Sequence, residues 1–231
     1  MEIKATCYIV AVLILLNGCV SFYNPQPVDI PLIKEKGDVR VDVGYFMMPD
    51  LNYINNSDSV ISSLGVHGTF SAGLTDNVAI QTYLSLDVFS KFHLQTALGL
   101  FQGFENKTVV EMYGGFGYGN GLWGESKNDY FLTFTQFNIG QSDLGRAHID
   151  YGLGLKGGFL FANSSTFSSS TFYQNSGWIF EPSVVFRVGG RRAKYSVKLN
   201  YLRTNTIADE YYFPFSVSMG ANFRAGKKVK R

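Results

Sequence analysis

Residues 78–102 read VAIQTYLSLDVFSKFHLQTALGLFQ, and this stretch decides the fold. Apolar side chains alternate with small or polar ones along residues 78–89 and again along residues 92–102. Strict alternation over such a length is typical of β-strands with one buried and one polar face. Only Ser90 and Lys91 separate the two runs, so the stretch predicts a β-hairpin.

The same alternation recurs on both sides of this hairpin, and no helical period of useful length follows Gly37. Short segments rich in Gly, Asn, Asp or Ser bound each run. An even number of strands would bring both ends of a closed sheet to the same side. We therefore expect an all-β fold, an antiparallel up-and-down barrel of about ten strands. The expected strands are 38–47, 61–73, 78–89, 92–102, 109–119, 129–140, 147–161, 178–189, 194–204 and 213–224.

One face of these strands is apolar and uncharged, except that both faces of 129–140 are partly apolar. The opposite face is rich in Gly, Ser, Gln and Asn and carries nearly all strand charges, with six acids balancing six bases. The acids are Asp38, Asp42, Asp87, Glu111, Asp150 and Glu181, and the bases are Arg40, Lys156, Arg187, Lys194, Lys198 and Arg224. Unpaired charges are costly inside a barrel, so we expect ion pairs there. The candidates are Arg40, Asp42, Asp87, Glu111, Asp150, Lys156, Glu181, Arg187 and Lys198.

Two architectures fit a closed sheet with one apolar face. In a lipocalin-like carrier the apolar face points inward, whereas in a transmembrane barrel it meets lipid. The polar face here has many glycines and few charges, which does not suit a solvated exterior. Aromatic residues at the strand ends suit an interfacial girdle. These features favour the transmembrane barrel, with a lumen that side chains nearly fill.

The connections predict an orientation. Links 74–77, 103–108, 141–146 and 190–193 are short, whereas the alternate links 48–60, 120–128, 162–177 and 205–212 are longer, with 90–91 the one exception. Outer-membrane barrels have short periplasmic turns and longer outer loops. If the N-terminal region is anchored by a lipid at Cys19 on the periplasmic side, the first strand runs outward and the long links face outside.

The N-terminal residues predict export. A polar start and the apolar run Ala5–Leu16 are typical of a signal peptide. Leu16-Asn17-Gly18-Cys19 resembles a lipobox, so Cys19 is expected to carry diacylglycerol, in a palmitate-bearing lipoprotein. An ordinary signal peptide is the alternative. We divide the chain into a signal peptide (1–18), an extended Pro-containing tether (19–36), the barrel (37–224) and a basic tail (225–231).

Several short motifs carry a resemblance. They are Tyr23-Asn24-Pro25, the run from Pro31 to Asp38, the run from Ala72 to Asn77, the run from Gln136 to Gly140, Glu181-Pro182, and the last strand from Val217 to Phe223. With these motifs the chain resembles small outer-membrane β-barrel proteins of Bacteroidota type, some of which carry a lipoprotein signal. The resemblance implies a bacterial outer-membrane location and implies no general activity. The chain departs from the pattern by continuing past Phe223 into its basic tail.

The residues that could support chemistry are sparse. His93 with Asp87 is the best acid/base pair, and it would suit a barrel enzyme active at its rim on lipid or peptide. His67 and His148 are too scattered to build a metal site with it, and we expect no cofactor, no metal and no nucleic-acid binding. The expected role is therefore non-enzymatic: structural, surface-interacting, or accessory to an envelope complex.

The expected partners are outer-membrane lipid and the machineries that process lipoproteins and assemble barrels. The hydroxyl-rich, aromatic loop 162–177 suits contact with sugar or protein. Asp58-Ser59-Val60 resembles a short O-glycosylation signal at Ser59.

Overall fold

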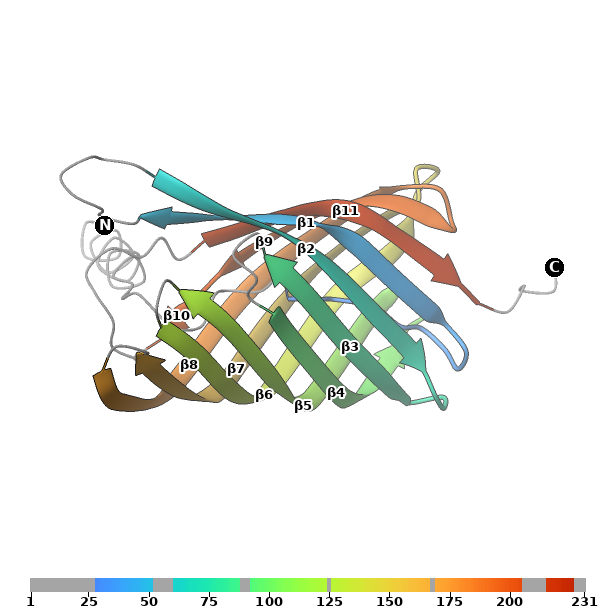
Figure 1. Ribbon diagram of the computed structural model, residues 1–231. Helices are drawn as coiled ribbons and strands as arrows, with labels where there is room; N and C mark the ends of the chain where they lie inside the picture. Colours follow the sequence, from blue (N-terminus) through green and yellow to red (C-terminus); the bar gives the residue numbers. More distant parts are fainter. Residues whose placement is uncertain are drawn as a thin grey trace, which may run out of the picture.

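A computed structural model describes residues 28–51, 60–87, 92–123, 126–166, 169–204 and 215–226 (Figure 1). All regular elements in these ranges are β-strands. Cys19, Ser59 and the tail from Lys227 lie outside the described residues. The strands are β1 (Val39–Leu51), β2 (Val60–Gly73), β3 (Val78–Asp87), β4 (Phe92–Gly103), β5 (Thr108–Trp123), β6 (Ser126–Leu144), β7 (Ile149–Thr166), β8 (Ser169–Gly189), β9 (Ala193–Tyr201), β10 (Arg203–Thr204) and β11 (Phe215–Ala225).

The strands close into one antiparallel up-and-down barrel. Each strand from β1 to β8 pairs with its neighbour in sequence, β11 pairs with both β1 and β9, and β9 pairs with β8. The short β10 also pairs with β8 and continues the line of β9 after Leu202. Counted together, β9 and β10 form one strand of a ten-stranded barrel. Closure rests on registers such as Val39 opposite Ala225. The expected fold class is confirmed.

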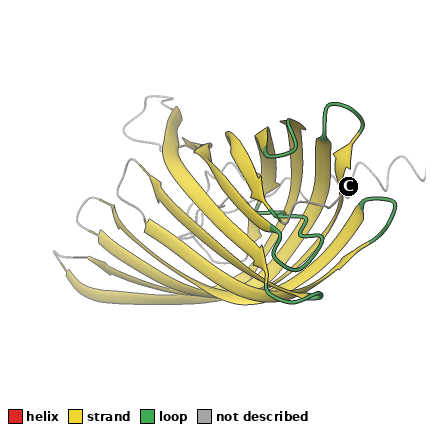
Figure 2. Cartoon of the chain, turned by 90° about the vertical axis from the view of Figure 1, so that its right-hand side faces the viewer, coloured by secondary structure: helices red, strands yellow, loops and turns green. Residues whose placement is uncertain are grey.

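The two ends of the barrel differ. At the near end (right in Figure 1), β1 begins and short turns join β2–β3, β4–β5, β6–β7 and β8–β9; Figure 2 looks onto this end. The strand ends that the other five connections join lie at the far end. Two of those were expected to be long loops, 120–128 and 162–177. That expectation is wrong, because β5 pairs with β6 as far as Trp123 and β7 with β8 as far as Thr166.

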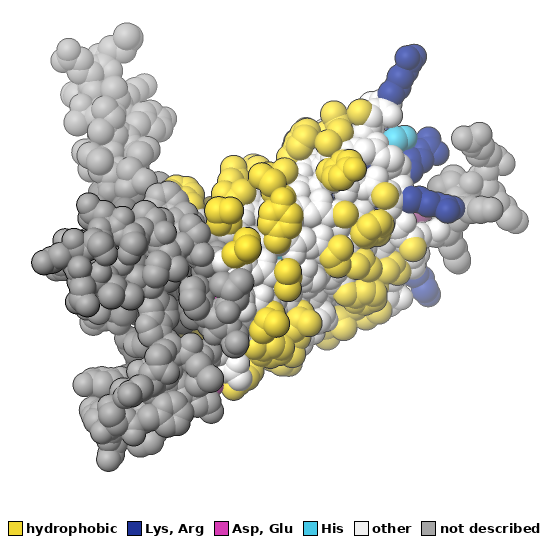
Figure 3. Space-filling model, turned by 45° about the horizontal axis from the view of Figure 1, so that its top comes forward, with side chains coloured by type: hydrophobic (Ala, Val, Ile, Leu, Met, Phe, Trp, Pro, Cys, Tyr) yellow, Lys and Arg dark blue, Asp and Glu magenta, His cyan; other side chains and the backbone are white. Residues whose placement is uncertain are grey.

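Apolar side chains face outward around the barrel (Figure 3). Val66, Leu98 and Phe159 are each about 60% exposed, although they lie in the middle of well-paired strands. The described side chains that are charged and face outward from a strand are Asp129 and Arg203, both toward the far end. This arrangement is the opposite of a lipocalin-like carrier, whose apolar face would point inward. No helix in the described ranges is long and apolar enough to cross a membrane.

The structure resolves the ambiguous strand 129–140. Within β6, Phe131, Phe137 and Ile139 point outward, whereas Leu132 and Phe134 are buried inside. Both faces of β6 are apolar because this part of the lumen is itself apolar. Leu132 and Phe134 belong to a buried cluster with residues of β7 and β8, which include Leu160, Ala162 and Ile179.

Residues 28–34 run inside the barrel. In Figure 1 they form a blue trace within the lumen that turns back at the near end into β1. Val28, Ile30, Leu32 and Ile33 are at most 3% exposed. We call residues 28–34 the lumenal segment. The sequence placed these residues in the tether, and the structure encloses them within the barrel.

Candidate functional site in the barrel lumen

Asp29 connects the lumenal segment to the basic residues of the barrel wall. Its Oδ1 lies 3.2 Å from Lys198 Nζ and 3.5 Å from Arg187 Nη2. Its backbone carbonyl accepts hydrogen bonds from the side-chain amides of Gln81 (3.1 Å) and Gln136 (2.6 Å). Asp29 is only 4% exposed, so these contacts are made away from bulk water, where charge pairing matters most.

Glycines in the wall make room for the segment's apolar side chains. A Cβ added to Gly152 would lie 3.0 Å from Ile30 Cγ2, and one added to Gly140 would lie 2.8 Å from Leu32 Cδ2. Ile30 and Leu32 also form a buried cluster with Val109 and Val185. The glycines thus open a groove on the inner face of β6 and β7 that the segment fills.

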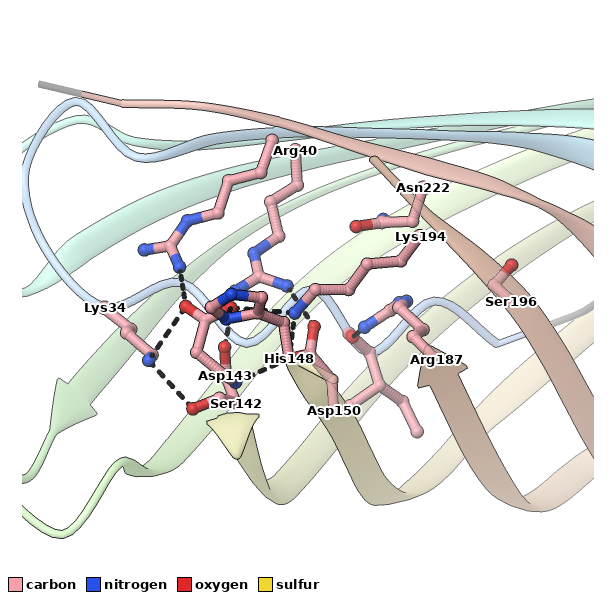
Figure 4. Close-up of polar contacts among 12 residues, drawn as sticks. Lys34, Arg40, Ser142, Asp143, His148, Asp150, Arg187, Lys194, Ser196 and Asn222 are labelled. Atoms are coloured by element: carbon pink, nitrogen blue, oxygen red, sulfur yellow. Dashed lines mark hydrogen bonds and ion pairs between the residues drawn. The ribbon is translucent and has the colours of Figure 1, made fainter. Parts of the chain in front are cut away.

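A second group of charges closes the near end (Figure 4), and Asp143 is its centre. One carboxylate oxygen of Asp143 lies 2.6 Å from Arg224 Nη1, and the other lies 2.9 Å from Lys194 Nζ. Asp143 sits where the register of β6 with β7 is irregular, with a φ of 61°. That left-handed conformation belongs to the bulge that holds the carboxylate among the bases.

Lys34 ties the end of the lumenal segment to the same cluster. Its Nζ donates to the backbone carbonyl of Ser142 (3.1 Å) and lies 3.6 Å from Asp143 Oδ2. Burial lowers the pKa of the Lys34 ammonium, while the Asp143 carboxylate opposes that change. Arg224 also contacts both carboxylate oxygens of Asp38: its Nε lies 2.7 Å from Oδ1, and its Nη2 lies 2.9 Å from Oδ2.

The structure brings most of the nine ion-pair candidates together. Arg40 Nη1 contacts Asp150 Oδ2 (3.1 Å), Lys198 Nζ contacts Asp42 Oδ1 (3.0 Å), and Lys156 pairs with Glu181. The Nε atom of Arg187 lies 3.8 Å from Asp42 Oδ2, and its Nη1 donates to the backbone carbonyl of Ile30 (2.9 Å). All of these side chains are buried.

Two candidates have a different environment. Glu111 accepts hydrogen bonds from the backbone N–H of Ile33 (2.6 Å) and the side-chain amide of Asn138 (3.0 Å). It therefore anchors the lumenal segment through hydrogen bonds. Asp87 is buried at the far end of β3.

Sequence reasoning missed Asp29 and Asp143. Asp143 lies in a stretch that the sequence assigns to a turn, and Asp29 precedes the first strand. A sequence signal for Asp29 existed: Val28-Asp29-Ile30-Pro31-Leu32-Ile33 is more apolar than a solvated tether needs. Its apolar residues require a partner, and only the fold supplies the inner groove of glycines.

The histidines have three separate environments. His93 is 2% exposed, and its two ring nitrogens contact Tyr130 and Gln95. His67 is 5% exposed and stacks on Tyr83 at a centroid distance of 6.0 Å. His148 lies in the near-end turn, with Nδ1 4.0 Å from Asp143 Oδ1. His93 thus faces the interior, although it is the second residue of β4 and lies near the far end.

The described residues contain no group of three or more His, Cys, Asp or Glu side chains placed to hold a metal ion. The lumenal charges contact one another and the lumenal segment. The arrangement therefore holds the lumenal segment inside the barrel by ion pairs and hydrogen bonds.

No protein-family model matches this chain, and no curated protein does. Similar solved structures include the attachment invasion locus protein Ail of Yersinia pestis, at 11% identity and a TM-score of 0.30, covering 82% of this chain and 99% of Ail. The outer membrane protein OprG of Pseudomonas aeruginosa is 10% identical with a TM-score of 0.26, covering 86% and 100%. The siderophore receptor PirA of the same organism is 12% identical with a TM-score of 0.24, covering 82% and 42%. Similarity this low carries no argument about function, which is argued below from the chain itself.

Proposed function

We propose that this protein is a bacterial outer-membrane β-barrel lipoprotein whose lumen is closed by its own N-terminal segment. Its role is structural or surface-interacting, or that of an accessory subunit of an envelope complex, and it catalyses no reaction. The observation that carries the proposal is the reversed distribution of side chains, apolar outside and charged inside.

The energetics of the surface support a lipid environment. Leu98 and Phe159 are about 60% exposed and belong to a band of large apolar side chains that continues over the barrel strands. Apolar surface costs roughly 25 cal/mol per Å² in contact with water, and soluble proteins rarely expose so continuous a band. In a membrane the same band is satisfied, and a closed barrel leaves no strand edge in the lipid.

The lumen supports a closed role. Arg40, Asp42, Asp150, Arg187 and Lys198 are each at most 2% exposed. A diffusion channel needs a water-filled bore, as in larger porins. The burial of His93 likewise keeps this candidate base of a rim enzyme away from solvent.

The transmembrane assignment is tested by refolding the chain without residues 1–18 and with Cys19→Ser in detergent. We expect faster gel migration unheated than boiled. Val66→Arg and Leu98→Arg should each destabilise the inserted barrel by about 2–4 kcal/mol, because they place a charge in lipid. Val66→Leu and Leu98→Met are the matched controls. A protein that stays monodisperse without detergent, or two silent arginines, would contradict the proposal.

The lipoprotein assignment has its own test. Cells that express the full chain are supplied with radiolabelled palmitate. We expect label on the unsubstituted chain and none on the Cys19→Ser variant. Equal labelling of the two chains would contradict lipidation at Cys19.

A further inference from the structure

The lumenal segment has a direction. Its end lies at the near rim, where Lys34 contacts Ser142 and the backbone N–H of Gly37 donates to the carbonyl of Gly73 (2.8 Å). Its beginning lies deeper, where the backbone N–H of Val28 donates to Asn200 Oδ1 (3.0 Å). Asn200 lies next to the last residue of β9 and pairs with Ser216, the second residue of β11. The chain therefore descends toward the near end. We call the level of residues 28–34 the near half of the lumen, and the level between Val28 and the far end the far half.

The near half of the lumen has no space for a second passage of the chain. Arg40, Lys194, Arg187 and Lys198 are each at most 4% exposed, and they converge on the level that the segment already occupies. A ten-stranded barrel is only slightly wider than one that side chains alone fill. A chain that turned back at Val28 to leave by the near end would have to displace this network.

The remaining length suffices for the other exit. From Asn200 to Thr204 the wall continues for four residues, or about 13 Å at 3.3 Å per residue. The nine residues from Cys19 to Pro27 can span up to about 30 Å. From Val28 this length is more than enough to pass the far end of β9 and β10.

We infer that the N-terminal part of the mature chain passes through the lumen to the far end, so that Cys19 lies on the same side of the membrane as the far-end connections. This inference rests on the proposed function. With the short turns in the periplasm, the acyl chains at Cys19 sit in the outer leaflet, facing outside the cell. It replaces the periplasmic anchor that the sequence suggested. The barrel orientation rests on the near end, where every turn has three or four residues, against a far end toward which the long strands β5 to β8 extend as hairpins.

The test compares single cysteines on intact cells with a membrane-impermeant maleimide. Ser21→Cys reports the residues next to the anchor, Asn55→Cys a far-end connection, and Arg192→Cys the exposed near-end turn between β8 and β9. The unsubstituted chain, with Cys19 in place, is the blank. We expect Ser21→Cys and Asn55→Cys to react on intact cells, and Arg192→Cys to react only after permeabilisation.

Each other outcome has a distinct meaning. If Ser21→Cys follows Arg192→Cys, or reacts only after unfolding, the inference is overturned and the barrel stands. If Asn55→Cys and Arg192→Cys react alike, the membrane barrel itself fails and the inference falls with it.

A disulfide cross-link tests independently whether the lumenal segment lies against β7. Ile30→Cys with Gly152→Cys should form a disulfide on oxidation, because Ile30 Cγ2 lies 3.0 Å from the position of a Cβ at residue 152. The bond is detected in membranes by non-reducing gel mobility after boiling. Ile30→Cys with Ala162→Cys, in the buried cluster of the far half, is the control and should stay reduced. Cross-linking of the control pair alone would place the segment elsewhere and overturn the inference.

Discussion

The two halves of the lumen are filled in different ways. In the near half, ion pairs such as Arg40–Asp150 surround the lumenal segment, which is not part of the barrel wall. Asp29 of this segment contacts Lys198 and Arg187. In the far half, the inner face of β3 to β8 carries rings and aliphatic side chains in place of these ion pairs. These side chains include Tyr83, His93, Tyr130, Leu132, Leu160 and Ile179, each at most 8% exposed.

Glycines show the difference most directly. In the near half, Gly152 faces Ile30 of the lumenal segment, so the space that it opens is filled by a residue remote in sequence. In the far half, Gly119 faces the ring of Tyr130, its partner residue on the adjacent strand. The wall of the far half from β3 to β8 can therefore pack as soon as neighbouring strands pair. The near half is complete only when residues 28–34 lie inside, which ties barrel closure to the placement of the N-terminal segment.

The largest expected effect is the loss of Asp29. Asp29→Ala leaves Lys198 and Arg187 sharing Asp42 as their remaining acidic contact among the described residues. Breaking a buried pair from one side costs about 3–5 kcal/mol. We expect a loss near the lower value in the free energy of unfolding, measured by urea titration in detergent with tryptophan fluorescence.

The matched control is Asp76→Ala, which removes an exposed carboxylate from a near-end turn and should change the free energy of unfolding by less than about 0.5 kcal/mol. Equal effects of the two substitutions would show that the lumenal segment does not hold the near half together.

The far half was the more predictable from sequence, and the reason is local. Alternation places a side chain inside or outside once a strand is recognised, so the inward position of Tyr83 followed from period two alone. The pair Lys156–Glu181, and in the near half the pair Arg40–Asp150, were within the set of candidates, although alternation could not say which acid meets which base. Pairing depends on the strand register around the whole barrel.

The near half could not be derived in this way. The alternation of residues 28–34 lasts only from Val28 to Leu32, too short to predict a buried segment, and Leu32 adopts a φ of 58° that the sequence pattern does not indicate. The groove that receives them is formed by Gly140, Gly152 and Gly154, which in sequence look like ordinary small residues of a crowded lumen. Asp143 was hidden for a related reason, since a bulge and not a regular turn positions it.

A smaller effect sharpens the role of the groove. Gly152→Val places methyl groups against Ile30 Cγ2 (3.0 Å from the new Cβ) and Val185 Cγ1 (3.3 Å). Overpacking of this kind costs about 1–3 kcal/mol. In an Ile30→Ala background the cost should fall by about 1 kcal/mol, because one of the two contacts is gone. The coupling is measured by urea unfolding of the four chains of this cycle.

Gly114→Val is the control for Gly152→Val. Gly114 faces outward from β5, with no atom within 4 Å of an added Cβ, so the added methyls meet lipid. We expect no loss of stability there. A cycle without coupling between residues 30 and 152 would mean that the groove is not occupied by Ile30.

The smallest effect belongs to the far half and its two buried histidines. Among the described residues neither ring nitrogen of His67 has a hydrogen-bond partner, whereas the ring of His93 contacts Tyr130 and Gln95. A buried polar group without a partner costs about 1–3 kcal/mol, and a group that loses its partner costs a similar amount. His67→Phe keeps the stacking on Tyr83 and removes the unsatisfied nitrogens, so the free energy of unfolding should hold or rise by about 1 kcal/mol. His93→Phe should lower it, because Tyr130 and Gln95 each lose a contact. Urea unfolding of both variants decides the point. If His67→Phe is the more damaging of the two, the ring of His67 has a polar partner in the folded protein.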